Sequence, residues 1–225
     1  MTKRGSRAGA GHGARAVRAE QTRRTLVLAA LDEFSRRPFD RVAIDDVAAA
    51  AGVAHGLVFH YFGSKRGLYL EALREVARQL RAIHADSGTG AAGERIRAML
   101  LRHLRYMSRH SALARHLFRG GLGTDPEAWN IIDASRAEAT TWIARELGLD
   151  PGNPALKLTL RAMSGAIDEA TVYWLDHRRL ASLVSMTDAL LEMVAAAVTA
   201  AARLDEGLDV APALSALGGP KMASR

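Results

Sequence analysis

The feature that most constrains the fold of this chain is a glycine turn between two short stretches with helical periodicity. Asp45 and Asp46 begin the first stretch, which stays apolar until Gly52. Acidic residues are favoured in the first turn of a helix, and glycine is favoured just past the last turn. In the second stretch, residues 55–62, apolar side chains recur at i, i+4 and can share one face. Two short helices joined by such a turn form a helix-turn-helix, which occurs in DNA-binding proteins and in helical hairpins that bind no DNA.

Helical periodicity flanks this motif on both sides. Upstream, an apolar stripe with helical spacing starts near residue 20 and ends before Pro38. Downstream, Ser64 can cap a longer helix whose apolar side chains keep the same spacing as far as Ile83. We therefore predict a helix-turn-helix domain over residues 20–84, made of three helices and a connecting fourth helix.

The remainder of the chain predicts a second, all-helical domain. The segment DSGTGAAG, residues 86–93, resembles a flexible joint, and glycine and proline residues separate the later helical stretches. We expect this domain over residues 85–206, a disordered basic arm over residues 1–19 and a flexible tail over residues 207–225. The predicted helices of the second domain cover residues 94–110, 113–118, 126–147, 155–178 and 182–204. The fold class is therefore all-α.

Positive charge is concentrated in the N-terminal part. The chain has a formal net charge of +7. Residues 1–82 contain 15 Lys plus Arg and 8 Asp plus Glu, so they account for the whole excess. A concentrated positive field favours a polyanionic partner, and it coincides here with the helix-turn-helix.

Several other function classes find no support in the sequence. The chain has no cysteine, which excludes disulfides, thiolate metal sites and cysteine nucleophiles. No HExxH, phosphate-binding loop or GxSxG motif is present, and the Asp45–Asp46 pair is explained by the start of a helix. We therefore expect no catalytic residue, no metal and no cofactor. The longest run of small apolar residues, 193–202, is shorter than the ~20 residues of a membrane span, which predicts a cytoplasmic protein without a membrane partner.

Residues 22–82 resemble the N-terminal domain of TetR-type (TetR/AcrR) transcriptional regulators. The resemblance is carried by AIDDVAAAAGVAHGLVFHYFGSKRGLYLEAL, in which Phe59, Phe62, Lys65 and Leu68 match an aromatic-x-x-Phe-x-x-Lys-x-x-Leu pattern. It implies that the second helix of the motif enters the major groove of double-stranded operator DNA. The residues at the family's contact positions are Ala54, His55, Gly56, Leu57, Phe59 and His60, with Lys65 on a phosphate.

Two departures from the family pattern remove hydroxyl groups from the expected DNA surface. Ala43 stands where the family usually has Thr or Ser, and Phe59 stands where it usually has Tyr. We expect other groups to supply the missing phosphate contacts, since arginine and histidine side chains can donate to phosphates or base edges. The candidates are Arg23, Arg24, Arg41 and the arginines of the N-terminal arm.

The resemblance also implies that the second domain dimerises and binds an effector. We expect a homodimer through the last two helices, because these are apolar on more than one side. The candidate pocket residues, each of which also suits an ordinary core, are Met99, His103, Tyr106, Met107, Phe118, Trp142, Asp168 and Trp174. The predicted function is a sequence-specific repressor that a small hydrophobic effector releases from its operator. The alternative is an architectural DNA-binding protein without an effector, which would have no operator preference.

Overall fold

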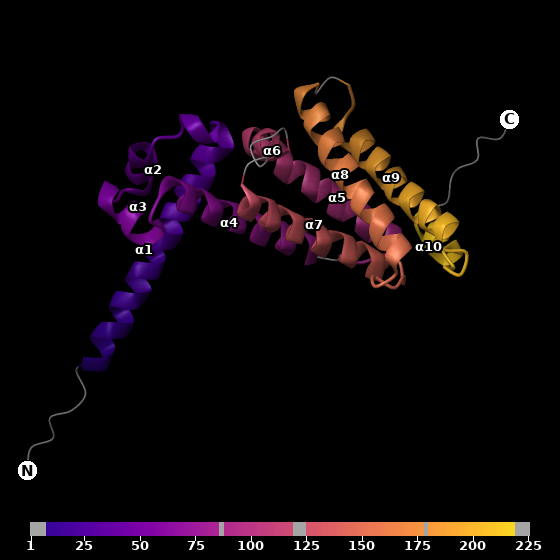
Figure 1. Ribbon diagram of the computed structural model, residues 1–225, viewed down its shortest axis with the longest axis horizontal. Helices are drawn as coiled ribbons and strands as arrows, with labels where there is room; N and C mark the ends of the chain where they lie inside the picture. Colours follow the sequence, from indigo (N-terminus) through magenta and orange to yellow (C-terminus); the bar gives the residue numbers. More distant parts are fainter. Residues whose placement is uncertain (1–7, 86–87, 119–124, 178–179, 219–225) are drawn as a thin grey trace, which may run out of the picture. The chain divides into compact units, whose positions relative to one another are not determined.

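The computed structural model describes residues 8–85, 88–118, 125–177 and 180–218, and all regular elements within these ranges are helices (Figure 1). The all-α prediction is therefore confirmed. The chain divides into two compact units, Met1–Val76 and Ala77–Arg225. The division falls inside one continuous helix, α4, and thus earlier than the joint that the sequence predicted at residues 86–93. The last turns of α4 belong to the second unit, where the Ile83 carbonyl accepts hydrogen bonds from Arg102.

The first unit contains the four helices that the sequence predicted. They are α1 (Ala8–Arg36), α2 (Ile44–Ala51), α3 (His55–Phe62) and the first part of α4 (Lys65–Ala85), with a short 3-10 turn, η1, at Phe39–Arg41. Their core is a set of fully buried side chains, among them Phe34, Val47, Val58 and Leu68. Phe34 also packs against the rings of Phe39 and Tyr69, which ties η1 to α1 and α4.

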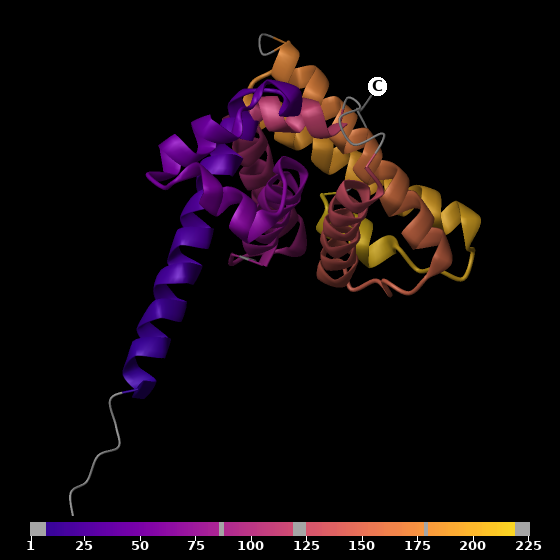
Figure 2. The same cartoon turned by 60° about the vertical axis from the view of Figure 1, so that its left-hand side comes forward.

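Helix α1 begins earlier than the sequence predicted. We expected residues 1–19 to be disordered, but the helix starts at Ala8 and runs without a break to Arg36. Its N-terminal half extends away from the other helices of the unit (Figures 1 and 2). The alanines and arginines of residues 14–19 favour a helix, whereas Gly9, Gly11 and Gly13 disfavour one, so composition alone did not predict this extension.

The second unit is a layered helical domain. Its helices are α5 (Ala92–Arg109), α6 (Ser111–Phe118), α7 (Pro126–Glu146), α8 (Pro154–Asp176), α9 (Leu183–Leu204) and α10 (Ala211–Ala216). Helices α8 and α9 lie side by side along much of their length (Figures 1 and 2). Side-chain caps define three of the starts, since Asp125, Asn153 and Ser182 each accept a hydrogen bond from a backbone N–H in the first turn that follows.

The C-terminal segment also differs from the expectation of a flexible tail over residues 207–225. Residues 211–216 form α10, and Val210 and Ala213 are buried. Helix α10 packs closely on α5, because a Cβ atom added to Gly93 would lie 2.2 Å from the carbonyl oxygen of Ala216. Small apolar residues of this segment pack against α5, which explains why the segment is ordered. Composition alone did not predict this packing.

Candidate nucleic-acid interface and effector region

The turn between α2 and α3 has a left-handed residue at its centre. Gly52 adopts φ 67° and ψ 33°, and its N–H bonds back to the carbonyls of α2. The next N–H, that of Val53, donates to the Ala48 carbonyl at 3.0 Å. Glycine adopts this conformation without the steric cost that a Cβ atom brings, so the sequence AGV can end α2 and start α3 within three residues. Val47, Ala48 and Val58 are buried beneath the turn and fix the packing of the two helices.

A second glycine fixes the other end of α3. Gly63 ends the helix at φ 72°, and the Ser64 hydroxyl then caps α4 by accepting a hydrogen bond from the Gly67 N–H at 3.0 Å. A Cβ atom at position 67 would lie 2.1 Å from the carbonyl oxygen of Phe62. Helix α4 can therefore follow α3 this closely only with glycine at position 67.

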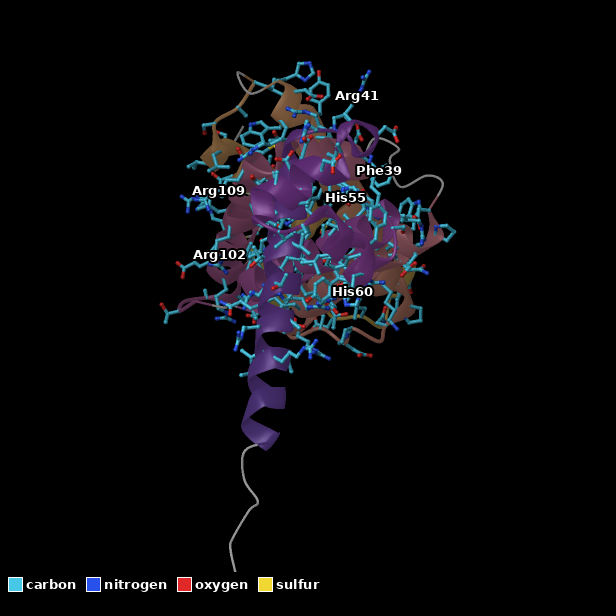
Figure 3. All side chains as sticks on the ribbon, turned by 90° about the vertical axis from the view of Figure 1, so that its left-hand side faces the viewer. Phe39, Arg41, His55, His60, Arg102 and Arg109 are labelled. Atoms are coloured by element: carbon cyan, nitrogen blue, oxygen red, sulfur yellow. The ribbon has the colours of Figure 1, made fainter. Side chains whose placement is uncertain are left out.

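The α3 residues predicted to contact DNA lie mostly at the surface. Ala54, His55, Gly56, Phe59 and His60 are exposed, and Leu57 is half-buried. His55 and His60 lie on the side of the first unit that faces the viewer in Figure 3. The face of α3 opposite the buried Val58 is thus free to enter a groove.

His55 is held in place by a neighbouring helix. Its Nδ1 lies 2.5 Å from Oδ1 of Asp45, and its ring centroid lies 5.1 Å from that of Phe59. The second ring nitrogen, Nε2, has no hydrogen-bond partner within the described residues. Asp45, which the sequence assigned only to the start of α2, therefore also orients a candidate base-contacting side chain.

The basic candidates divide into free and engaged side chains. Arg24 and Arg41 are exposed, and neither has an ion pair within the part of the chain that the structure describes. Arg23, in contrast, forms ion pairs with Glu71 and Glu20, so it is occupied within the first unit. Lys65 is half-buried, with its Nζ 4.5 Å from the centroid of the Phe39 ring. Glu20 lies at the i,i+3 spacing of a helix, whereas Glu71 and Phe39 could not be identified as partners from local spacing.

Two candidate effector residues, Asp168 and His103, have buried polar atoms in the second unit. Asp168 is buried and pairs with Arg136, whose Nε lies 2.7 Å from Oδ2, while burial raises the pKa of Asp168 to about 6. The Nε2 atom of His103 is buried without a hydrogen-bond partner among the described residues. Burial lowers the pKa of His103 to about 3 and that of the adjacent His84 to about 4.

Most of the other effector candidates are core side chains. Met99, Tyr106, Met107 and Trp174 are buried, and the Trp174 indole donates to the Ala181 carbonyl at 2.9 Å. The side chain of Phe118 lies outside the described residues. Trp142 is half-buried and lines a cavity of about 420 Å³ between the end of α4 and α7. The cavity adds Arg81, His84 and Arg145, which sequence reasoning did not single out.

Two searches of the described residues bear on metal and membrane binding. No group of three or more His, Asp or Glu side chains within them is arranged to hold a metal ion. Helix α9 is long and apolar enough to cross a membrane by length and composition alone, a test that core helices of soluble proteins also pass. This helix packs against α5 and α8.

Both units match known regulatory families. Residues 26–72 match the family described as bacterial regulatory proteins, tetR family, and residues 92–200 match the tetracyclin repressor-like C-terminal domain. The chain is 32% identical over 160 residues to the HTH-type transcriptional regulator Mb3439c of Mycobacterium bovis, which covers 68% of this chain and 81% of that protein. A solved tetR-family transcriptional regulator from Streptomyces coelicolor superposes with a TM-score of 0.78 at 29% identity, covering 89% of this chain and 92% of that one.

Another relative matches a smaller share of the chain. The HTH-type transcriptional regulator BetI of Agrobacterium fabrum is 36% identical over 86 residues, which is 38% of this chain and 42% of that protein. The match thus spans less than half the length of that relative.

Proposed function

Since the chain belongs to the tetR family of bacterial regulatory proteins, we propose that it is a cytoplasmic repressor that binds operator DNA and releases it when a small molecule binds the second unit. The observation that carries this proposal is the exposed face of α3, held between the Gly52 turn and the Gly67 joint. Such a helix is the element that helix-turn-helix proteins place in the major groove.

The exposure and charge of these side chains indicate which of them contact bases and which contact phosphates. Ala54, His55, Gly56, Leu57, Phe59 and His60 face the bases. Arg24 and Arg41 supply phosphate contacts, since both are exposed and unpaired within the described residues. Lys65 contacts a phosphate while its stem stays against the Phe39 ring. Arg15 and Arg18, exposed on the N-terminal half of α1, add further positive charge.

The proposed active form is a homodimer through α8 and α9. Leu158 and Tyr173 on α8 and Val184 on α9 are more than half exposed in the single chain. Their exposure supports a second copy as the cover of this face. Twofold symmetry then predicts a palindromic operator whose half-sites lie about 34 Å apart.

Selection of bound sequences from a random DNA pool tests the proposal. We expect an enriched palindrome and a steep fall in affinity with salt, because phosphate neutralisation releases counterions. Replacing His55 or His60 with Ala should change the selected bases, at about 1–3 kcal/mol per specific contact. Tight binding without any enriched sequence would instead support the architectural alternative.

A further inference from the structure

The cavity between α4 and α7 has the size of a small-molecule site. Its volume of about 420 Å³ falls within the range of about 300–1,000 Å³ that is typical of ligand pockets. Its polar lining comprises Arg81 and His84 from the last turns of α4, and Glu138, Thr141, Trp142 and Arg145 from α7. All of these residues belong to the second unit.

Hydrogen-bond donors without a partner dominate this lining. Arg81 and Glu138 form an ion pair, with Arg81 Nη1 2.8 Å and 3.1 Å from the two carboxylate oxygens. The guanidinium of Arg145 and the indole N–H of Trp142 have no partner within the described residues. Arginine and tryptophan side chains donate but cannot accept hydrogen bonds. A complementary ligand must therefore bring acceptor atoms.

The charge of the cavity sets the charge of that ligand. Arg81 and Arg145 are cationic, Glu138 is anionic, and His84 is neutral near pH 7 because burial lowers its pKa to about 4. One positive charge is thus left uncompensated, on Arg145. A planar carboxylate matches the guanidinium geometry with two parallel hydrogen bonds.

The remaining lining of the cavity favours a ligand whose main part is apolar and flat. The half-buried Trp142 offers an aromatic surface, and Ala85 and Ala137 leave room beside it. Aromatic rings prefer such a partner in a stacked or edge-on arrangement. We propose that this cavity binds a small aromatic monocarboxylate, with its ring against Trp142 and its carboxylate on Arg145.

The same geometry suggests how the ligand acts, an inference that rests on the proposed repressor function. The Arg81–Glu138 pair ties the last turns of α4 to α7. A ligand held on Arg145 fills the cavity that Arg81 and Glu138 line, and its body competes with this pair for space. Helix α4 is continuous from Lys65, directly after the recognition helix, to Ala85 in the cavity wall. Loosening the pair therefore acts on the helix that α3 leads into.

Calorimetry on the full-length protein tests the site with 2-naphthoate and its uncharged isostere 2-naphthamide. We expect the carboxylate to bind about tenfold more tightly or better, which corresponds to about 1.4 kcal/mol. Arg145→Met should abolish this preference, and Trp142→Leu should weaken both compounds. The control is Arg105→Met, on an exposed arginine of α5 outside the cavity, which should retain the preference. Equal binding of the two compounds, or an intact preference in Arg145→Met, would overturn the proposal.

A second measurement separates this inference from the repressor function itself. Operator affinity is measured by fluorescence anisotropy with and without saturating 2-naphthoate. We expect the ligand to weaken operator binding, and the operator to weaken ligand binding by the same factor. Unchanged operator affinity overturns the regulatory role of the cavity. If the unliganded protein selects no DNA sequence, the repressor function fails, while the calorimetric result still decides the ligand class.

Discussion

Gly67 illustrates how one residue can set the position of the recognition helix. Replacing a glycine inside a helix with alanine usually stabilises it by about 1 kcal/mol. At position 67 the added Cβ would meet the Phe62 carbonyl oxygen. We predict that Gly67→Ala lowers the free energy of unfolding and weakens operator binding, as measured by urea denaturation and gel shift.

The matched control for this substitution is Gly56→Ala on α3. A Cβ atom there meets nothing within 4 Å, so the ordinary propensity gain of up to about 1 kcal/mol should appear in denaturation. If Gly67→Ala stabilises the protein as much as Gly56→Ala does, the close joint between α3 and α4 does not exist in solution.

His84 and His103, whose pKa values are lowered, make the stability of the second unit depend on pH. The pKa of His103 falls to about 3 and that of His84 to about 4, so the unfolded chain binds more protons below pH 6.5. Stability from each histidine is complete above pH 6.5 and is lost as the pH falls toward the folded-state value. Between pH 7.5 and pH 5, this amounts to about 2 kcal/mol per histidine.

We predict that the His103→Leu variant loses less unfolding free energy between pH 7.5 and pH 5 than the wild type, by the contribution of one histidine. At pH 7.5 the variant should be at least as stable as the wild type, because it replaces a buried ring nitrogen that has no partner among the described residues. Urea denaturation at pH 7.5 and pH 5 measures both effects. Asp168, whose pKa is raised to about 6, acts in the opposite direction in both proteins and cancels in the comparison. Equal losses in the two proteins would contradict the prediction.

The residue scale is also where the sequence was least informative. The Gly52 turn and the extent of α3 followed from local spacing, because caps and helical periodicity act within a few residues, whereas the contact residues on α3 followed from the family resemblance. The partner of Arg23 is Glu71, and that of Asp168 is Arg136, so both pairs join separate helices. Such pairing depends on how helices pack, and no local pattern encodes it. Arg23 therefore seemed available for DNA although the fold occupies it.

At the scale of elements, the N-terminal half of α1 is a basic helix with little cover. Arg15, Arg18 and Val17 are exposed, and Glu20 is the first acidic residue of the chain. We predict that Arg15→Ala with Arg18→Ala weakens binding to all DNA sequences alike. If both side chains contact phosphates, the slope of log affinity against log salt should become shallower by up to about 1.8. The selected operator sequence should stay the same.

The control is a second pair of exposed arginines, Arg105→Ala with Arg109→Ala on α5. This pair removes the same charge from the second unit and should leave the salt slope nearly unchanged. An identical effect of both pairs would mean that net charge alone, rather than a contact by α1, drives the change.

At the scale of the whole molecule, the sequence established the helical class and the order of the helices. The helices at the two ends of the chain were harder to predict, because α1 and α10 are composed of residues that are also common in mobile termini. Sequence reasoning also did not predict the cavity, since its walls come from residues 81–85 of α4 and residues 137–145 of α7, which lie more than 50 residues apart in the chain. Helix order is thus a local property of this chain, whereas its sites depend on packing.

Dimerisation is the property of the whole molecule on which the palindromic operator depends. The exposed side chains of Leu158 and Tyr173 lie on α8, and Val184 lies on α9. A charged residue on such a face would lose its hydration in the dimer without gaining a partner. We predict that Leu158→Glu with Val184→Glu yields a monomer at micromolar concentration in analytical ultracentrifugation, with an unchanged helical circular dichroism spectrum.

The same variant should bind a single half-site as weakly as the wild type does, and should lose the added affinity of the full palindrome. That gain comes from the second recognition helix, which binds at the high effective concentration set by the dimer. Leu204→Glu, an exposed position at the end of α9, is the control for added charge. A double variant that still sediments as a dimer would place the interface outside this face of α8 and α9, and the half-site spacing would then have to be derived from another pair of helices.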